Sequence, residues 1–263
     1  RGSRIVGHVA VEPGADDAGA AYVYRHDGSA WAWEATLHDP EGAEEDCFGI
    51  RVDIFQNIVV VGAPGDDEGA EDTGSAFVYR HDGSDWGLEQ KLLASDGEAD
   101  DGFGGDVAIR DSLAVFGAHC DDDQGDRAGA AYVFRHDGAQ WTEEAKLLAS
   151  DGAERENFGN SVATNGSAVI IGALNDDDNG SESGSAYVFE KEGPDWIEQA
   201  KLLPVDGQEG DRFGWSIGID AQTLVIGAAM PSPPSPPGTG AGYVFELDGP
   251  DCNENGICDG RDI

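Results

Sequence analysis

A 55-residue repeat constrains this fold more than any other feature of the sequence. Phe-Gly pairs begin at residues 48, 103, 158 and 213, and Gly-Ala pairs follow at 62, 117, 172 and 227. The tetrapeptide "RHDG" recurs with the same step at 25, 80 and 135. A fixed period of this size is typical of repeat architectures, in which each unit is one supersecondary motif. The sequence therefore contains about five copies of one unit.

Each repeat contains four segments with strand character. The first, such as 48–54, alternates apolar and polar residues, and the second, such as 58–61, is continuously apolar, as in a strand covered on both faces. The third, such as 76–79, is aromatic and β-branched and leads to the hairpin signal Asp-Gly. The fourth, such as 141–148, mixes charged and apolar residues, as suits an outer strand. Four antiparallel strands per repeat predict an all-β fold, a β-propeller built of four-stranded blades.

The repeats predict the domain organisation. We expect residues 1–249 to form the propeller, with the first repeat beginning at its second strand and the last ending after its third. Residues 250–263 form a separate tail. The expected repeats are 1–47, 48–102, 103–157, 158–212 and 213–249.

The motif series "FG…VVVGAP…GSAFVY" resembles the FG-GAP repeat of integrin α-subunit propellers and of many bacterial surface proteins. The resemblance covers about residues 4–247 and implies a secreted or cell-surface bacterial protein that binds a protein or glycan. Integrin-type repeats carry a calcium loop between the first two strands. Here that connection shrinks to tight turns such as "FQN" and "RDS", so those metal sites are not expected. Seven blades are usual in the family, which implies a fragment of a longer protein, with a compact five-unit ring as the alternative.

The charge of the chain limits its partners. It carries 53 acidic and 15 basic side chains, a formal net charge of −38, which would repel nucleic acids and anionic membranes. No apolar run approaches the ~20 residues that span a bilayer, so we expect no membrane insertion. We expect a monomer with a basic or cation-bridged partner.

Antiparallel connectivity predicts where the acidic residues lie. In each blade the loops from the second to the third strand, and from the fourth strand to the next blade, leave from one end, which we call the loop end. The other two turns leave from the opposite turn end. The candidate calcium ligands at the loop end are Asp66, Asp67, Asp121, Asp122, Asp123, Asp176, Asp177 and Asp178. Calcium prefers such oxygen ligands. The alternative is a solvated acidic surface in a salt-adapted organism.

The tail contains the clearest metal motif. The segment "DCNENGICDGRD" fits the spacing of an EF-hand calcium loop, with Gly256 at the turn position. It resembles the calcium loops of dockerins. The expected ligands are Asp251, Asn253, Asn255, Ile257 (through its carbonyl), Asp259 and Asp262. We therefore expect bound Ca²⁺, held weakly because Asp262 is shorter than the usual Glu.

The four cysteines allow two disulfides. Cys252 and Cys258 lie in the same short loop and could pair with each other. Cys47 and Cys120 both lie in loop-end connections of adjacent repeats, and we expect a disulfide between them. An even number of cysteines favours an oxidising compartment.

The motifs favour a non-catalytic binding or adhesion protein over an enzyme. The repeated "RHDG" is interpreted as a hairpin turn, because one catalytic centre does not need three copies. Trp215 is the one asymmetric aromatic residue, and we expect it in the core. Two alternatives remain open: a polysaccharide lyase or hydrolase, and a structural module attached to a catalytic domain outside this chain.

Overall fold

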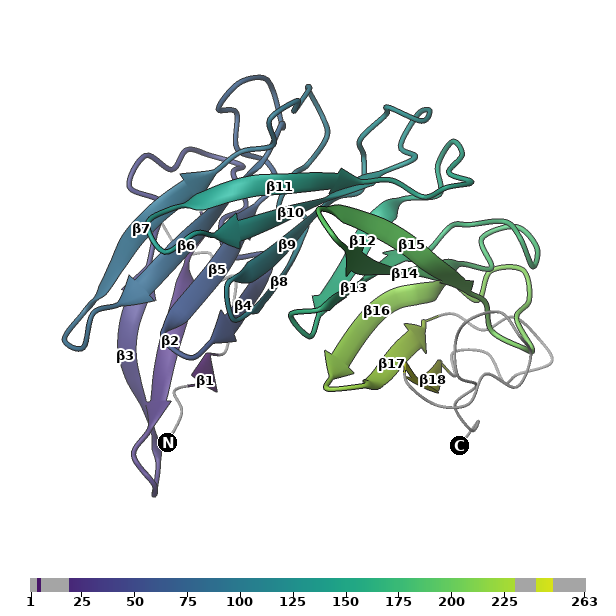
Figure 1. The fold of residues 1–263 in the computed structure, drawn as a ribbon. Coiled ribbons are helices and arrows are strands. Elements are labelled where there is room, and N and C mark those ends of the chain that lie inside the picture. The colour runs from purple at the N-terminus through teal and green to yellow at the C-terminus, as the bar shows by residue number, and fades with distance from the viewer. Residues whose placement is uncertain (1–3, 6–18, 230–239, 248–263) are drawn as a thin grey trace. The chain divides into compact units, whose positions relative to one another are not determined.

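The computed structural model describes residues 4–5, 19–229 and 240–247 (Figure 1). All regular structure in these residues is β-strand. They contain no helix long and apolar enough to cross a membrane. The all-β prediction is confirmed within this part of the chain.

Three sheets are four-stranded antiparallel meanders, as the repeat predicts. In each, the strands follow one another in chain order from the first to the fourth. The first sheet comprises β4 (Val52–Phe55), β5 (Ile58–Ala63), β6 (Ser75–His81) and β7 (Trp86–Leu92). The second comprises β8 (Asp106–Arg110), β9 (Leu113–Ala118), β10 (Ala130–His136) and β11 (Trp141–Leu147). The third comprises β12 (Phe158–Thr164), β13 (Ala168–Ala173), β14 (Ser185–Glu192) and β15 (Asp195–Leu202).

The sheets at the two ends of the sequence have three strands. The N-terminal one contains β1 (Arg4–Ile5), β2 (Ala21–His26) and β3 (Trp31–Leu37), which are the second, third and fourth strands of a repeat. The C-terminal one contains β16 (Phe213–Asp220), β17 (Thr223–Ala228) and β18 (Ala241–Glu246), which are the first three. Within the described residues, these two sheets have the strands that the sequence predicts for the first and last repeats; the bounds of the repeats and closure into a ring stay predictions.

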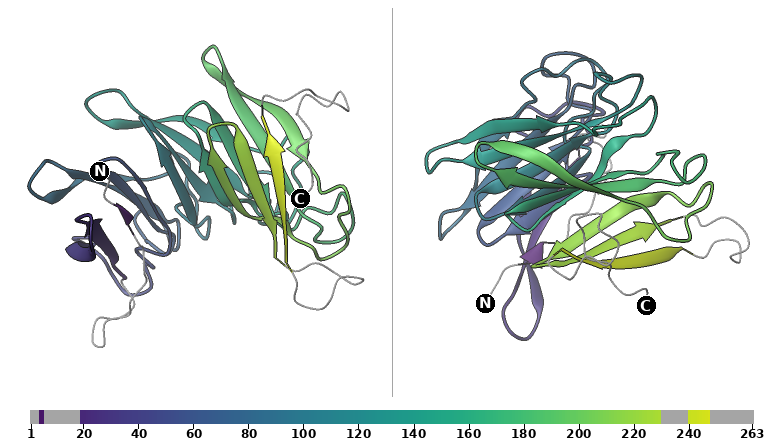
Figure 2. Two further views of the ribbon diagram at one scale, coloured as in Figure 1. Left: turned by 90° about the horizontal axis from the view of Figure 1, so that it is seen from below. Right: turned by 45° about the vertical axis from the view of Figure 1, so that its right-hand side comes forward.

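The chain divides into two compact units. One consists of residues 1–118 and 132–144, and the other of residues 119–131 and 145–263. Within the second unit, the β16–β18 sheet packs on the β12–β15 sheet (Figure 2), with Ile170 and Val188 facing Leu224 and Ile226 in one apolar cluster.

The core lies between neighbouring sheets. Every residue of β5, β9 and β13 is buried, which confirms that the second strands of the four-stranded sheets are covered on both faces, whereas β17 is exposed at Thr223 and Val225. The phenylalanines of the four Phe-Gly pairs are at most 1% exposed. A Cβ on Gly62 would lie 2.0 Å from the carbonyl oxygen of Gly104, so this position accepts only glycine. The Phe-Gly and Gly-Ala motifs are therefore packing features of the sheet contacts.

The "RHDG" motif forms the turn between the third and fourth strands. Asp82 Oδ1 accepts hydrogen bonds from the N–H groups of Ser84 (2.7 Å) and Asp85 (3.0 Å), and Gly83 has a φ of +109°. His81 Nδ1 accepts the Gly83 N–H at 3.1 Å, which leaves its Nε2 to carry the proton. The aspartate and glycine are thus explained by turn geometry.

The histidine of the motif connects neighbouring sheets through a glutamate that the arginine of the glutamate's own sheet holds, a role that the sequence analysis did not foresee. Arg80 makes a bidentate ion pair with Glu89 of the next strand, at 2.7 and 3.0 Å. His136 Nε2 of the following sheet lies 3.1 Å from the same carboxylate. Arg25, Glu34 and His81 repeat this arrangement one period earlier. Each glutamate therefore joins its own sheet to the next.

We predict that Asp82 titrates far below an ordinary aspartate. Hydrogen bonds from the Asp85 and Ser84 amides, and from the Ser84 hydroxyl, lower the pKa of Asp82 to about 2. Its contribution to folding stability is therefore complete above its unfolded pKa, about 3.9, and is lost as pH falls through about 2. Carbon-detected NMR titration of the Asp82 carboxyl would measure this directly. The S84A variant should move the midpoint upward, and a native midpoint near 4 would contradict the turn geometry.

Candidate functional site

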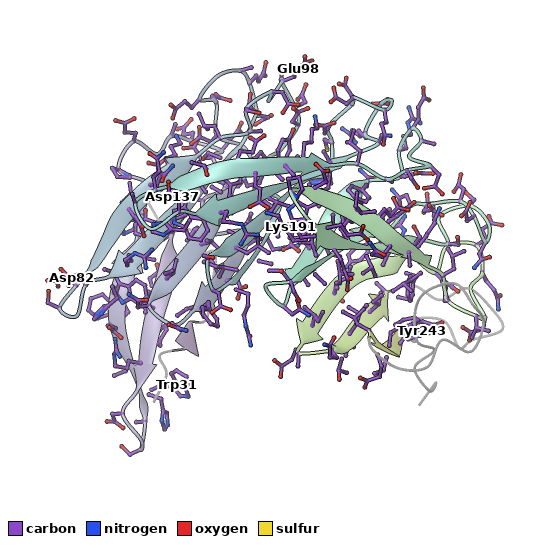
Figure 3. All side chains as sticks on the ribbon, in the orientation of Figure 1. Trp31, Asp82, Glu98, Asp137, Lys191 and Tyr243 are labelled. Carbon is purple, nitrogen blue, oxygen red and sulfur yellow. The ribbon has the colours of Figure 1, made fainter. Side chains whose placement is uncertain are left out.

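The acidic loops lie at the end of each sheet where antiparallel connectivity places them. Figure 3 shows Glu98 at the loop end of the first unit, and Asp82 at the opposite end of the β4–β7 sheet, in a turn between third and fourth strands.

A buried aspartate lies near the start of the loop between the second and third strands in each of the three four-stranded sheets. Asp66, Asp121 and Asp176 are 4%, 2% and 0% exposed. The Oδ1 atom of each accepts the N–H two residues later, at 2.8, 3.2 and 3.0 Å. Its backbone carbonyl accepts the N–H of a glycine eight residues later, at 2.9, 2.8 and 2.9 Å. The aspartate therefore fixes both ends of its loop.

A lysine from the fourth strand neutralises each buried aspartate. The Nζ atoms of Lys91, Lys146 and Lys201 lie 2.7, 2.8 and 2.6 Å from the Oδ2 atoms of these aspartates, in the same order. Each lysine also contacts the acid two residues further along the loop, at 2.7 to 2.8 Å. These second acids are Glu68, Asp123 and Asp178.

The lysine charge is stabilised by these contacts. Burial would lower the pKa of Lys91, but its hydrogen bonds to Asp66 and Glu68 outweigh that effect and raise it. For Lys201 the same balance, with three carboxylates in contact, raises the pKa well above its usual range. Contact with these carboxylates therefore favours the charged form of Lys91 and Lys201.

An aromatic residue of the third strand lies beneath the lysine. Lys91 Nζ is 5.2 Å from the Phe77 ring centroid, and Lys201 Nζ is 5.2 Å from that of Tyr187. The Tyr187 hydroxyl lies 2.8 Å from Asp151 Oδ1 and 3.1 Å from Asp176 Oδ2. Burial raises the pKa of Tyr187 well above its usual range, so the hydroxyl keeps its proton.

A second acid recurs in the loops that lead to the next sheet. Its carboxylate accepts the N–H of the residue three positions earlier, at 2.6 to 2.9 Å. Burial raises the pKa of Asp46 and of Glu156. The four members of this set are Asp46, Asp101, Glu156 and Asp211.

One group of carboxylates has a composition suited to a cation. Asp39, Asp46 and Asp66 each offer an oxygen within 4.8 Å of the other two. Asp39 is particular to this site, because the corresponding residues of the later repeats are Ala94, Ala149 and Pro204. The ammonium of Lys91, in contact with Asp66, adds a positive charge that would weaken the binding of a cation here.

The candidate calcium residues of the loops fall into two sets. Asp66, Asp121 and Asp176 are buried against lysine, and Asp123 and Asp178 share that lysine. The other three, Asp67, Asp122 and Asp177, are exposed. Calcium in these loops stays a prediction, and it would compete with an ammonium group at each buried aspartate.

Three further sequence predictions have different outcomes. Trp215 is 43% exposed, so its expected place in the core is wrong. Cys47 and Cys120 are partly buried, and their disulfide stays a prediction. The tail loop, its six ligands and the Cys252–Cys258 pair lie outside the described residues.

The lysines are the functional residues that the sequence analysis missed. Lys91, Lys146 and Lys201 keep the 55-residue step, as do the aspartates that they contact. They are three of only four lysines in the chain. Their regular spacing among so many acids was the signal that could have revealed the pairs.

Comparison with known proteins agrees with this architecture. The FG-GAP repeat model matches residues 31–79, 86–134, 141–189 and 196–245, which make up most of the chain. No curated protein sequence matches. A functionally unknown protein from Desulfotomaculum acetoxidans has a similar structure, with a TM-score of 0.56 and 11% identity, over 98% of this chain and 67% of that one. At 11% identity, this similarity shows a shared fold and nothing further.

These findings define a protein of repeated, blade-like antiparallel sheets. The chain belongs to the FG-GAP repeat family.

We predict that the buried ion pairs stabilise the fold strongly. The K146M substitution leaves Asp121, whose side chain is 3% exposed, without its counter-charge. The free energy of unfolding should fall by about 3 kcal/mol, as when one partner of a buried pair is removed. Urea unfolding followed by tryptophan fluorescence would measure the loss.

Two control variants separate this effect from a general loss of charge. The K146M/D121N double variant should recover most of the stability, because the amide needs no counter-charge. The R155Q substitution breaks an exposed pair with Asp126 and should cost less than about 1 kcal/mol. Equal losses in K146M and R155Q would contradict the structural role of the lysines.

Proposed function

We propose that this protein is a secreted or cell-surface binding protein that recognises a basic or cation-bridged ligand, a protein or a glycan, through its loop ends. The proposal rests chiefly on one observation, the exposed carboxylates held on loops that are fixed from below by buried Lys–Asp pairs.

The rigidity of these loops supports a binding role. Pre-organised carboxylates lose little conformational entropy when a ligand binds, which favours affinity. Asp122 and Asp177 are exposed directly beside buried aspartates, so their charges project from anchored loops. A row of negative charge also attracts cationic partners and speeds their association.

The repetition supports binding over catalysis. The Asp–Lys pair, its neighbouring acid and the aromatic platform recur with little change from sheet to sheet. A ligand with repeated positive charges could engage several loops at once and gain avidity from this spacing.

We predict that removing exposed loop-end charge weakens the binding of a cationic ligand. The D122N/E154Q/D177N variant removes three exposed carboxylates at the loop end of the second unit. Loss of these three charges should together lower the affinity for a short oligolysine probe by about tenfold at low salt. Isothermal titration calorimetry at two salt concentrations would measure the loss.

The matched control removes equal charge from the turn end of the same unit. The E190Q/E192Q/D195N variant replaces three exposed carboxylates around the β14–β15 turn. It should bind the probe nearly as well as the native protein. If both variants lose the same affinity, net charge and not the loop end determines binding, and the proposal fails.

Calcium association is the second part of the proposal. Asp39, Asp46 and Asp66 supply the hard oxygen ligands that calcium prefers, and backbone carbonyls or water would complete its six to eight ligands. Bound calcium would neutralise this carboxylate group and could bridge to a ligand. The tail loop around Gly256 is the other proposed site.

We predict a saturable rise of the unfolding midpoint in calcium that molar potassium chloride does not reproduce, because a site-bound ion stabilises the native state by mass action. Differential scanning calorimetry in chelator, calcium and potassium chloride would measure it. D39N should remove the part due to the carboxylate group, and D251N the part due to the tail. If the unfolding midpoint rises only in potassium chloride, the carboxylates have a general solvation role instead.

A further inference from the structure

The sequence contains two acceptor motifs for N-linked glycosylation, which have the form Asn-x-Ser/Thr with any residue except proline at x. They are 165–167 and 179–181, and both consist of Asn-Gly-Ser. No other asparagine of the chain is followed two positions later by serine or threonine. An acceptor asparagine belongs on a surface loop of a secreted protein, where its amide is accessible. The surroundings of the two motifs therefore decide between them.

The first motif is closed by its own hydrogen bonds. It forms the turn between β12 and β13, and Asn165 is partly buried. Its Oδ1 atom accepts the N–H groups of Ser167 and Ala168 at 2.9 and 2.8 Å, and the Ser167 hydroxyl at 3.0 Å. Its Nδ2 atom donates to the carbonyl oxygen of Ala221, in the turn between β16 and β17, at 2.7 Å. Both the amide and the hydroxyl of this motif are therefore engaged in the turn.

The second motif lies in the acidic loop between β13 and β14. Asn179 and Ser181 are both exposed. The Asn179 N–H donates to Ser183 Oγ at 3.1 Å, which holds the backbone of the loop in place. The side-chain Nδ2 atom donates to the carbonyl oxygen of Pro204 at 3.3 Å, a longer bond than that of Asn165. An asparagine amide has two N–H donors, so a glycosylated amide keeps one of them for this bond.

A purely structural role does not account for both residues of this motif. The residue at the Asn179 position of the preceding sheet is Gln124, whose Nε2 atom donates to the carbonyl oxygen of Ala149 at 3.0 Å. Glutamine therefore satisfies this loop contact equally well. The residue at the Ser181 position is an acid in both preceding loops, Glu71 and Asp126. The third loop thus departs from the repeat at both positions that define the acceptor motif.

We propose that Asn179 is the acceptor of an N-linked oligosaccharide delivered by a polyprenyl-diphosphate carrier. The Nδ2 atom forms a bond to C1 of the first sugar, and the bond between C1 and the diphosphate oxygen breaks. The amide gives one proton to a base of the transferase, and polyprenyl diphosphate leaves.

This site rests on the secreted or cell-surface location in the proposed function, because N-linked glycans belong to secreted proteins. The glycan would stand beside the exposed carboxylates of Asp177 and Asp178. A bulky neutral group at this position would limit the access of large ligands to the third loop.

Glycan transfer to the folded protein tests the proposal. The protein is incubated with a purified single-subunit oligosaccharyltransferase that needs only the Asn-x-Ser/Thr motif, and with a polyprenyl-diphosphate oligosaccharide. Intact-mass spectrometry and peptide mapping then count and locate the glycans. We expect one glycan per chain, on Asn179. Synthetic peptides of residues 161–171 and 175–185 should both be glycosylated, because only the fold distinguishes the two motifs.

Matched serine-to-alanine variants identify the acceptor without changing either asparagine. S181A should abolish the mass increase of the folded protein. S167A makes the same change in the motif of the β12–β13 turn and should leave the mass increase as in the native protein.

Three results would overturn the proposal. The first is a folded protein that gains no glycan, whether or not the 175–185 peptide is modified. The second is transfer to Asn165 to the same extent as to Asn179, and the third is an unchanged mass increase in S181A. The oligolysine titration uses the unglycosylated protein, so the binding proposal and the glycan proposal fail independently of each other.

Discussion

The buried contact between a lysine ammonium and an aspartate carboxylate is the interaction on which the loop end depends. An aspartate that is 0% exposed, such as Asp176, cannot keep its charge without a partner, because burial of an isolated carboxylate is too costly. Lys201 supplies that charge from the outermost strand, and so ties the loop to the edge of its sheet. The loop geometry, the position of the outer strand and the orientation of Tyr187 all follow from this contact.

The same interaction explains how so acidic a protein can fold. A net charge of −38 opposes compaction through self-repulsion. The few cations are placed where repulsion is greatest: three of the four lysines lie beneath the loops, and Arg25, Arg80 and Arg135 pair with glutamates near the turn ends. Other buried acids, such as Asp46 and Asp101, are held by backbone N–H groups instead. The exposed carboxylates, such as Asp67 and Asp122, are screened by water and counter-ions.

The sequence contained most of the fold and less of the site. Strand order and the incomplete end sheets could be predicted, because the 55-residue step and the alternation of apolar residues are local signals. The cross-strand pairs could not be read from local patterns, since Lys146 and Asp121 are 25 positions apart and meet only when the second and fourth strands join one sheet. Trp215 was misplaced for a related reason: its burial depends on a neighbouring sheet, which the periodic pattern of its own strand does not report.

The sequence repeat and the sheet are out of phase, and this affects how the molecule could grow and unfold. The family unit 86–134 supplies β7 to one sheet and β8–β10 to the next. Duplication of such a unit never adds an isolated sheet, because each new copy completes its predecessor and leaves its own last sheet one strand short. Each repeat unit therefore contributes strands to two neighbouring sheets, and one continuous stretch of backbone connects them. Unfolding of one unit would take strands from two sheets, so unfolding should spread from one sheet to the next along the chain.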